Sequence, residues 1–229
     1  MELSKRLKMI SSYVDKCDSL IDVGTDHGYI PIYLVKKGIC NTSIASDINK
    51  GPIEKAKLNV RMEGLKDKIS CRLGGGLKTV KESEIESVII AGMGGNLTRD
   101  ILIEDMNKVK KFKFLILQPA QNPEVLREYL YKNNYEILAE DVCFDEGKFY
   151  ELFKIRYDEK NNGYEIKDLI DLEVSPMIRE HKNETVKAFV NDKINKYKGI
   201  LKYIKDDTEA AKKRKAEIEK KIIKLKEMK

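Results

Sequence analysis

A glycine turn that follows a short apolar run constrains the fold of this chain more than any other segment. The run 20–23 leads into the turn Gly24-Thr25-Asp26-His27-Gly28, and an apolar helical stretch follows. A buried strand that ends in a glycine turn and opens a helix is typical of nucleotide-cofactor sites in α/β proteins. We therefore predict that this unit belongs to a parallel sheet with helices on its faces.

The chemistry of this turn argues against a dinucleotide. In a Gly-x-Gly-x-x-Gly loop, bare backbone N–H groups lie against a pyrophosphate, but here Asp26 stands where the middle glycine would be. Its carboxylate would repel phosphate, and it suits a cofactor that has no phosphate and carries a sulfonium and an ammonium group. S-adenosylmethionine (SAM) has these properties, whereas an NAD-dependent oxidoreductase is disfavoured.

The first part of the chain alternates strands with helices. Leu3, Leu7, Ile10 and Val14 recur at helical spacing, so an amphipathic helix opens the chain. Strands are predicted at 19–23, 43–47, 69–73, 87–91, 114–117, 135–144 and 148–157, and helices begin near Gly28, Gly51, Gly94 and Asn122. The turn 145–147 predicts a hairpin, so the last strand is antiparallel. This pattern predicts an α/β fold with a Rossmann-like seven-stranded sheet of the class I methyltransferase type.

The strand pattern stops at the polar segment 158–163, which predicts a domain boundary. We expect residues 1–158 to form a SAM-binding domain and residues 159–229 to form a helical domain. Helical segments are predicted at 166–172, 183–205 and 208–228. The last two, joined at 205–207, are expected to form an antiparallel, coiled-coil-like α-helical hairpin.

Positive charge is concentrated in the C-terminal segment. Residues 201–229 contain 11 Lys and Arg against 6 Asp and Glu, a net charge of +5 in a chain whose total is +6. Such an excess on one segment indicates a polyanionic partner. A solvated, salt-bridged helix face is the alternative interpretation.

Several other classes of protein are disfavoured by composition. No run approaches the ~20 apolar residues of a membrane span, and residues 1–9 alternate charge with leucine, so neither a span nor a signal peptide is predicted. The four cysteines lack a Cys-x-x-Cys pair, which is typical of reduced thiols in a cytoplasmic protein. The two histidines lie far apart in the sequence, so no metal site is predicted.

Candidate cofactor residues follow the predicted strands. Asp22 is placed to order the turn or to reach the amino group of the methionine moiety, and Asp47 lies at the spacing at which an acid meets ribose hydroxyls. The glycines after the third strand leave room for a flat base. The alternatives are structural roles: a helix cap at Asp26, a strand-end turn at Asp47 and a flexible turn at the glycines. The predicted cofactor-binding residues are Asp22, Gly24, Thr25, His27, Gly28, Asp47, Ile48, Gly74, Gly75, Gly76, Ala91, Gly92 and Met93.

The loop 91–96, after the fourth strand, bears on the identity of the methyl acceptor. Enzymes that methylate an exocyclic amine place an Asn/Asp-Pro-Pro-Tyr segment there, and this chain lacks it. An acceptor with a ready lone pair, such as a ring nitrogen, needs no such segment. After the fifth strand, Gln118 and its neighbours supply amide groups for reading a base edge, or form only a polar loop before a helix.

Four segments resemble the bacterial tRNA adenine(22)-N(1)-methyltransferase family. They span 3–7, 22–31, 90–95 and 117–119, and they include the specific signatures Asp-His-x-Tyr-x-Pro and Ala-Gly-Met-Gly-Gly. The resemblance implies a SAM-dependent enzyme that methylates ring nitrogen N1 of adenine 22 in tRNA. The family loop after the third strand reads Gly-Asp-Gly-Leu, and here Gly75 replaces the acid.

The expected reaction assigns roles to further residues. Asp26 is the predicted electrostatic catalyst, and Tyr29 is the predicted platform on which the target base stacks. The predicted substrate-binding residues are Gly94, Gln118, Pro119, Lys212, Lys213 and Arg214. We expect a monomer with tRNA as its partner, and a dimer stays open. The alternatives are a small-molecule or protein methyltransferase on the same fold, and a catalytically idle RNA-binding protein that retains the SAM fold.

Overall fold

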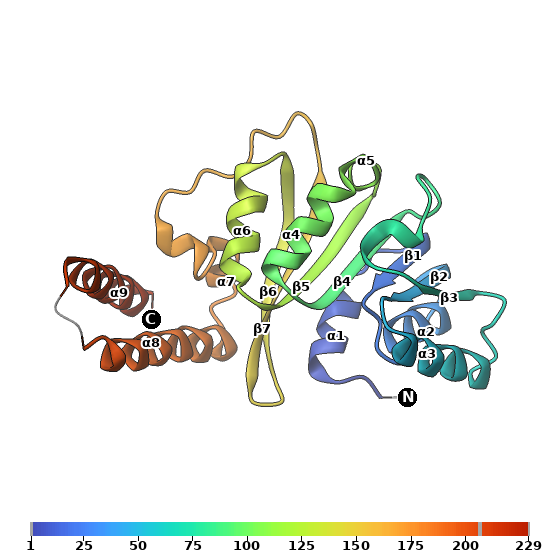
Figure 1. The fold of residues 1–229 in the computed structure, drawn as a ribbon, viewed down its shortest axis with the longest axis horizontal. Helices are drawn as coiled ribbons and strands as arrows, with labels where there is room; N and C mark the ends of the chain where they lie inside the picture. The colour runs from blue at the N-terminus through green and yellow to red at the C-terminus, as the bar shows by residue number, and fades with distance from the viewer. Residues whose placement is uncertain (1, 206–207, 229) are drawn as a thin grey trace. The chain divides into compact units, whose positions relative to one another are not determined.

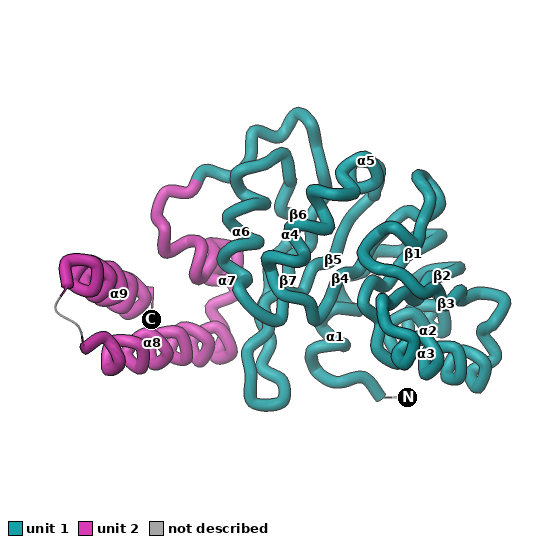
Figure 2. The backbone as a smooth tube through the Cα atoms, in the orientation of Figure 1, with its two compact units in different colours: residues 1–165 teal, residues 166–229 magenta. Residues whose placement is uncertain are grey.

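The computed structural model describes residues 2–205 and 208–228. The chain divides into two compact units, Met1–Glu165 and Ile166–Lys229 (Figure 2). The division follows Glu165, whereas the predicted boundary follows Asp158, because the intervening segment packs on the first unit. There the backbone N–H of Tyr164 donates to the carbonyl of Tyr131 at 2.8 Å, and the two rings lie 4.6 Å apart between centroids. Residues 206 and 207 of the predicted turn lie outside the described residues.

The first unit is built on one seven-stranded sheet with the order β3-β2-β1-β4-β5-β7-β6 (Figure 1). The strands are β1 Cys17–Val23, β2 Cys40–Asp47, β3 Ile69–Leu73, β4 Ser87–Gly94, β5 Phe114–Gln121, β6 Tyr135–Asp145 and β7 Lys148–Tyr157. The first five strands run parallel, and β7 pairs antiparallel with both β5 and β6. The predicted sheet, with its antiparallel last strand, is confirmed.

Helices cover both faces of this sheet (Figure 1). They are α1 Lys5–Ser12, α2 Tyr29–Lys36, α3 Lys50–Met62, α4 Gly95–Glu104, α5 Met106–Val109 and α6 Pro123–Lys132, with a 3₁₀ turn at Gly76–Thr79. Because side chains alternate along a strand, Val88 and Ile90 pack in one core with α4, α5 and α6, whereas Ile89 packs in the other with α1, α2 and α3. The Val- and Ile-rich strands are therefore buried on both faces, as parallel strands require.

Two strands continue further toward the carboxyl edge of the sheet than the sequence pattern indicates. β4 reaches Gly94 and β5 reaches Gln121, and their register shifts at Ala91, Met93 and Gly94. Gly92 has a φ of +81°, a conformation that favours glycine and permits a bulge. The segments predicted as loops after these strands are therefore largely a bulged, still-paired end of the sheet.

The second unit is helical. It contains a 3₁₀ turn at Leu169–Leu172, α7 Pro176–Glu180, α8 Glu184–Tyr203 and α9 Glu209–Glu227, with α8 and α9 packed side by side. The carboxylate of Glu173 accepts hydrogen bonds from Lys193 Nζ at 3.4 Å and Lys221 Nζ at 2.6 Å. Burial opposes ionisation of Glu173, but these two cations outweigh it and lower the pKa of the carboxyl. The hairpin is thus fastened to the segment before it by a partly buried ion cluster.

Candidate active site

The turn after β1 is held by backbone hydrogen bonds to the neighbouring strand. The N–H groups of Gly24 and Thr25 both donate to the carbonyl of Ser46, each at 2.8 Å. Gly24 has a φ of +79°, and a Cβ there would lie 2.4 Å from Cε of Met93. Gly28 has a φ of +70° and opens α2. The predicted residues Gly24 and Met93 are therefore in contact, and the positive φ at Gly24 and Gly28 disfavours a side chain at either position.

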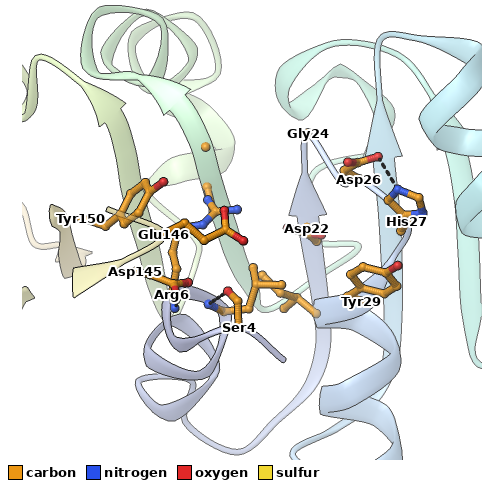
Figure 3. Close-up of a pocket in the computed structure, with 14 residues that line it drawn as sticks. Ser4, Arg6, Asp22, Gly24, Asp26, His27, Tyr29, Asp145, Glu146 and Tyr150 are labelled. Atoms are coloured by element: carbon orange, nitrogen blue, oxygen red, sulfur yellow. Dashed lines mark hydrogen bonds and ion pairs between the residues drawn. The ribbon is translucent and has the colours of Figure 1, made fainter. Parts of the chain in front are cut away.

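A pocket of about 400 Å³ lies at the carboxyl ends of β1 and β4 (Figure 3). This edge is where open α/β sheets bind ligands. Of the predicted site residues, the pocket wall contains Asp22, Gly24, Asp26, His27, Tyr29, Ala91 and Gly92. Figure 3 shows Asp26, His27 and Tyr29 on one side, Arg6, Glu146 and Tyr150 on the other, and Asp22 between them.

Asp22 carries the strongest electrostatic signal in this pocket. Its side chain is buried, with 5% of the residue exposed, and burial raises the pKa of its carboxyl from 3.8 to about 6, although the charge of Arg6 opposes this shift. Thr25 also lowers this pKa, yet its buried Oγ1 makes no hydrogen bond of good geometry within the described residues. A buried acid in the wall of a cavity indicates a ligand with hydrogen-bond donors.

The other predicted residues of the turn are more exposed. One Asp26 carboxylate oxygen lies 3.5 Å from His27 Nε2, and 69% of the Asp26 side chain is accessible to solvent. The rings of His27 and Tyr29 stack at 5.1 Å between centroids with planes 10° apart. His27 therefore occupies one face of the Tyr29 ring, and a base can stack only on the other.

A second group of predicted residues lies where β2 and β3 end. The backbone N–H of Gly74 donates to the Asp47 carbonyl at 2.9 Å, and Asp47 Oδ1 accepts from Asn49 N at 2.7 Å. Gly75 adopts an extended conformation, and a Cβ there would meet Ile48 Cδ1 at an ordinary 3.5 Å. The backbone would therefore accept the aspartate that is typical of this position. Gly76 starts the following 3₁₀ turn with a φ of +55°.

Gln118 and Pro119 differ most from their predicted role as a surface that reads a base edge. Both are buried, and Gln118 Nε2 donates to the Pro119 carbonyl at 2.8 Å while Gln118 Oε1 accepts from Arg6 Nη1 at 2.8 Å. The amide of Gln118 thus bonds to the protein at both ends and supports Arg6. Gly94 lies at the start of α4, where its carbonyl accepts from the Thr98 hydroxyl at 3.1 Å.

The structure adds pocket residues that the sequence analysis did not select. They are Ser4, Arg6, Leu7, Ile30, Asp145, Glu146 and Tyr150. The backbone N–H of Arg6 donates to Asp145 Oδ2 at 2.9 Å and lowers the pKa of that carboxyl. The segment 3–7 was noted in the sequence for its resemblance to the family. Only the folded structure shows that this segment lies against the β6–β7 hairpin and forms a wall of the pocket.

Known proteins identify the family to which this site belongs. A family model described as tRNA (adenine(22)-N(1))-methyltransferase, TrmK, matches residues 20–227. The Bacillus subtilis (strain 168) enzyme of that description is 35% identical over 184 residues, which cover 80% of this chain and 77% of that protein. The chain belongs to this family. The predicted family, reaction class and cofactor are thereby confirmed.

Solved structures of this family share the fold over almost the entire chain. Bacillus subtilis TrmK superposes with a TM-score of 0.86 and 32% identity, covering 99% of this chain and 98% of that one. M. capricolum TrmK in complex with S-adenosylhomocysteine, its natural cofactor product, superposes with a TM-score of 0.83 and 28% identity, covering 99% and 97%. The residues of the present pocket fit such a cofactor, because its ammonium group would pair with the buried carboxyl of Asp22 in the pocket wall.

The predicted tRNA-binding residues of the C-terminal segment lie in the second unit. Lys212, Lys213 and Arg214 are exposed on α9, and Lys212 Nζ approaches Glu209 at 3.6 Å. Within the described residues, no helix is both long enough and apolar enough to cross a membrane. The same residues contain no group of three or more His, Cys, Asp or Glu arranged to hold a metal ion.

Proposed function

We propose that this protein transfers a methyl group from SAM to N1 of adenine 22 in tRNA. The observation that carries the proposal is an acid-lined pocket, built from the family's own segments, at the carboxyl ends of the parallel strands. When bound, SAM supplies its methyl group as an electrophile, which the N1 lone pair takes from sulfur. Because N1 already has a lone pair, the protein must position the base more than deprotonate it.

The residues around the pocket divide this work. Asp22 and Thr25 hold the amino-acid end of the cofactor. Its adenosine is held by residues at two strand ends, among them Asp47 at the end of β2 and Gly75 after β3. Asp26 faces the positive charge that develops on the target adenine, and Tyr29 offers one ring face to the unstacked base. N1 is a pairing atom within a stack, so the base must leave the tRNA core to be methylated.

The decisive experiment incubates the protein with methyl-labelled SAM and an unmodified tRNA transcript and then maps the label. We expect label at N1 of adenine 22 and none in a transcript with guanine at that position. Label on protein or on small molecules would favour a different methyltransferase. Binding of tRNA without turnover would favour the idle RNA-binding protein.

Replacing Asp26 with alanine is expected to lower kcat about tenfold or more while the melting temperature stays unchanged. A lost electrostatic contact to a transition state costs up to 10²–10³-fold, and the exposure of Asp26 reduces that effect. Single-turnover methylation at saturating SAM measures it. Glu54→Ala, which removes an exposed acid from α3, is the matched control. A variant with normal kcat would remove Asp26 from the mechanism.

The exposed cations of α9 are proposed to grip tRNA phosphates, with the α8–α9 hairpin acting as a coiled-coil-like arm. Each lost phosphate contact reduces the slope of log affinity against log salt by about 0.7–0.9. Replacing Lys212, Lys213 and Arg214 with alanine should therefore reduce that slope by about 2–3 and leave SAM affinity unchanged. The control replaces three exposed lysines of the first unit, Lys55, Lys66 and Lys68. Equal effects of both triple variants on tRNA binding would assign no special role to α9.

We also propose that the protein is a cytoplasmic monomer. A cytoplasmic site follows from its proposed tRNA substrate. One chain has a mass of 26.4 kDa, so light scattering of the free protein distinguishes this state from a dimer.

A further inference from the structure

The β6–β7 hairpin extends past the neighbouring strands of the sheet (Figure 1). β5 pairs with β7 from Phe153 to Ile155, whereas β6 and β7 stay paired as far as Asp145 and Lys148. Because β7 runs antiparallel to β5, the residues before Phe153 continue toward the carboxyl edge of the parallel strands. The hairpin tip, residues 141–152, therefore stands at the edge of the sheet that holds the pocket.

The two faces of the hairpin tip differ in what they contact. Side chains alternate between the faces of a strand, and on one face Tyr150 lines the pocket. Phe144 and Phe149 lie directly opposite each other in the ladder and point to the other face. That face also carries Glu151, which bonds to Arg127 on α6. One face of the tip thus belongs to the pocket, and the other carries an aromatic pair outside it.

The ring of Phe144 is far more exposed than the other phenylalanines whose burial is nearly complete. Phe144 is 47% exposed, whereas Phe112, Phe114, Phe153 and Phe189 are at most 5% exposed. Its ring centroid lies 4.8 Å from that of Phe149, with the planes tilted by 53°. Such a cross-strand pair stabilises a hairpin, but the exposed part of the Phe144 ring adds nothing to that contact. It is open to a ligand.

The charge beside this ring indicates the chemistry of that ligand. Lys148 is exposed at the same tip and forms no ion pair within residues 2–205 and 208–228. An exposed aromatic ring next to an available cation is suited to unpaired nucleotides, because the ring stacks on a base and the cation meets a phosphate. One exposed ring is much smaller than the area that a stable protein–protein interface buries. An RNA segment is therefore the partner that these residues fit.

We infer that Phe144 stacks on a tRNA base next to the target adenine, while the pocket on the other face of the hairpin tip receives the target itself. This inference rests on the proposed methylation of tRNA and adds a substrate-binding residue to it. The tip then separates two bases that are stacked in the free tRNA. Phe144 replaces part of the stacking that is lost when the target leaves the tRNA core.

The first test measures kcat/KM for an unmodified tRNA transcript. Phe144→Ala should lower it about fivefold or more, as expected for a lost base–aromatic contact. Phe144→Leu keeps an apolar side chain without a π-face and should be equally impaired, whereas Phe144→Tyr should match the wild type. Calorimetric titration should give the wild-type affinity for SAM in all three variants. Leu138→Ala, which removes an exposed apolar side chain from the other end of β6, is the matched control.

A second test observes the stacking itself. The chain contains no tryptophan, so Phe144→Trp introduces a single fluorescent reporter that can still stack on a base. Adding tRNA should quench its fluorescence, and adding SAM alone should not. Leu138→Trp places the same reporter at the far end of the strand, where tRNA should leave its fluorescence unchanged.

Several outcomes would overturn the inference. Wild-type kcat/KM in Phe144→Ala would remove the ring from tRNA binding, and wild-type kcat/KM in Phe144→Leu alone would show that apolar bulk suffices. If Phe144→Ala lowers the melting temperature, the comparison of Phe144→Leu with Phe144→Tyr still decides. A change of mass in light scattering of Phe144→Ala would assign the ring to a contact with a second copy. Failure of the wild-type protein to methylate tRNA would instead contradict the proposed function.

Discussion

Replacing Asp22 with asparagine is expected to stabilise the ligand-free protein at neutral pH and to weaken its binding of SAM. Burial raises the pKa of Asp22 to about 6, against 3.8 as its ordinary value. An acid whose pKa is raised in the folded state favours folding most when it is protonated. That stability is fully present below pH 4 and is lost as pH rises through 6. At one pKa unit per 1.36 kcal/mol, the ionised side chain costs about 3 kcal/mol at pH 7.

The stability difference between Asp22→Asn and the wild type should therefore depend on pH. It should be close to zero at pH 4, where both side chains are neutral, and reach its full value above pH 6. Urea unfolding at several pH values measures it. Asp67→Asn, which changes an exposed loop acid, is the control and should show no such trend. A difference that is the same at pH 4 and pH 7 would contradict the assignment.

The same variant should lose SAM affinity. A hydrogen bond to a charged group contributes about 1.5–3 kcal/mol, which corresponds to roughly 10- to 150-fold in the dissociation constant. In the wild type, affinity should also fall as pH drops below 6, because the proton competes with the ammonium group for Asp22. In Asp22→Asn this dependence should disappear. Isothermal titration with SAM between pH 5 and pH 8 measures both effects, and unchanged affinity would exclude Asp22 from the cofactor site.

Replacing Arg127 with leucine is expected to be the most destabilising of these substitutions. Arg127 is fully buried, and its Nε and Nη2 donate to Glu140 at 2.8 Å and to Glu151 at 2.7 Å. Tyr131 adds a hydrogen bond to Glu140 at 2.9 Å. Removing the arginine leaves two carboxylates buried between α6 and the β6–β7 hairpin. Breaking a buried ion pair on one side costs about 3–5 kcal/mol.

A matched substitution on the β6–β7 hairpin tests whether burial causes this cost. Arg156 contacts Glu136 at 2.5 Å, but 50% of the arginine side chain is exposed, and exposed pairs contribute about 0–1 kcal/mol. Arg156→Leu should therefore change the free energy of unfolding by less than 1 kcal/mol. Adding Glu140→Gln and Glu151→Gln to Arg127→Leu should recover part of the loss. Equal effects of Arg127→Leu and Arg156→Leu in urea unfolding would show that the buried cluster is no stronger than a surface pair.

The strands and long helices were predictable because their signals are local. Runs rich in Val and Ile predict strands buried on both faces, and Asp145-Glu146-Gly147 predicts the hairpin whose second strand is β7. The bulged ends of β4 and β5 were not predictable, because their register depends on how two separate strands pair. The helix α7 is short and carries no periodic pattern over its five residues, so it was missed as well.

The candidate site shows where the sequence was sufficient and where the fold decided. The sequence alone determined the glycine turn, the acid Asp22 before it and the preference for a cationic cofactor, because the strand, the acid and the turn follow one another directly along the chain. Only the tertiary structure placed Arg6 against Gln118 and beside Tyr150, each of which is more than a hundred positions from Arg6 in the sequence. It also buried the Gln118 amide, which was predicted to read a base edge. Contacts at such separations depend on how helices and hairpins pack across a sheet, and a local pattern carries no record of that packing.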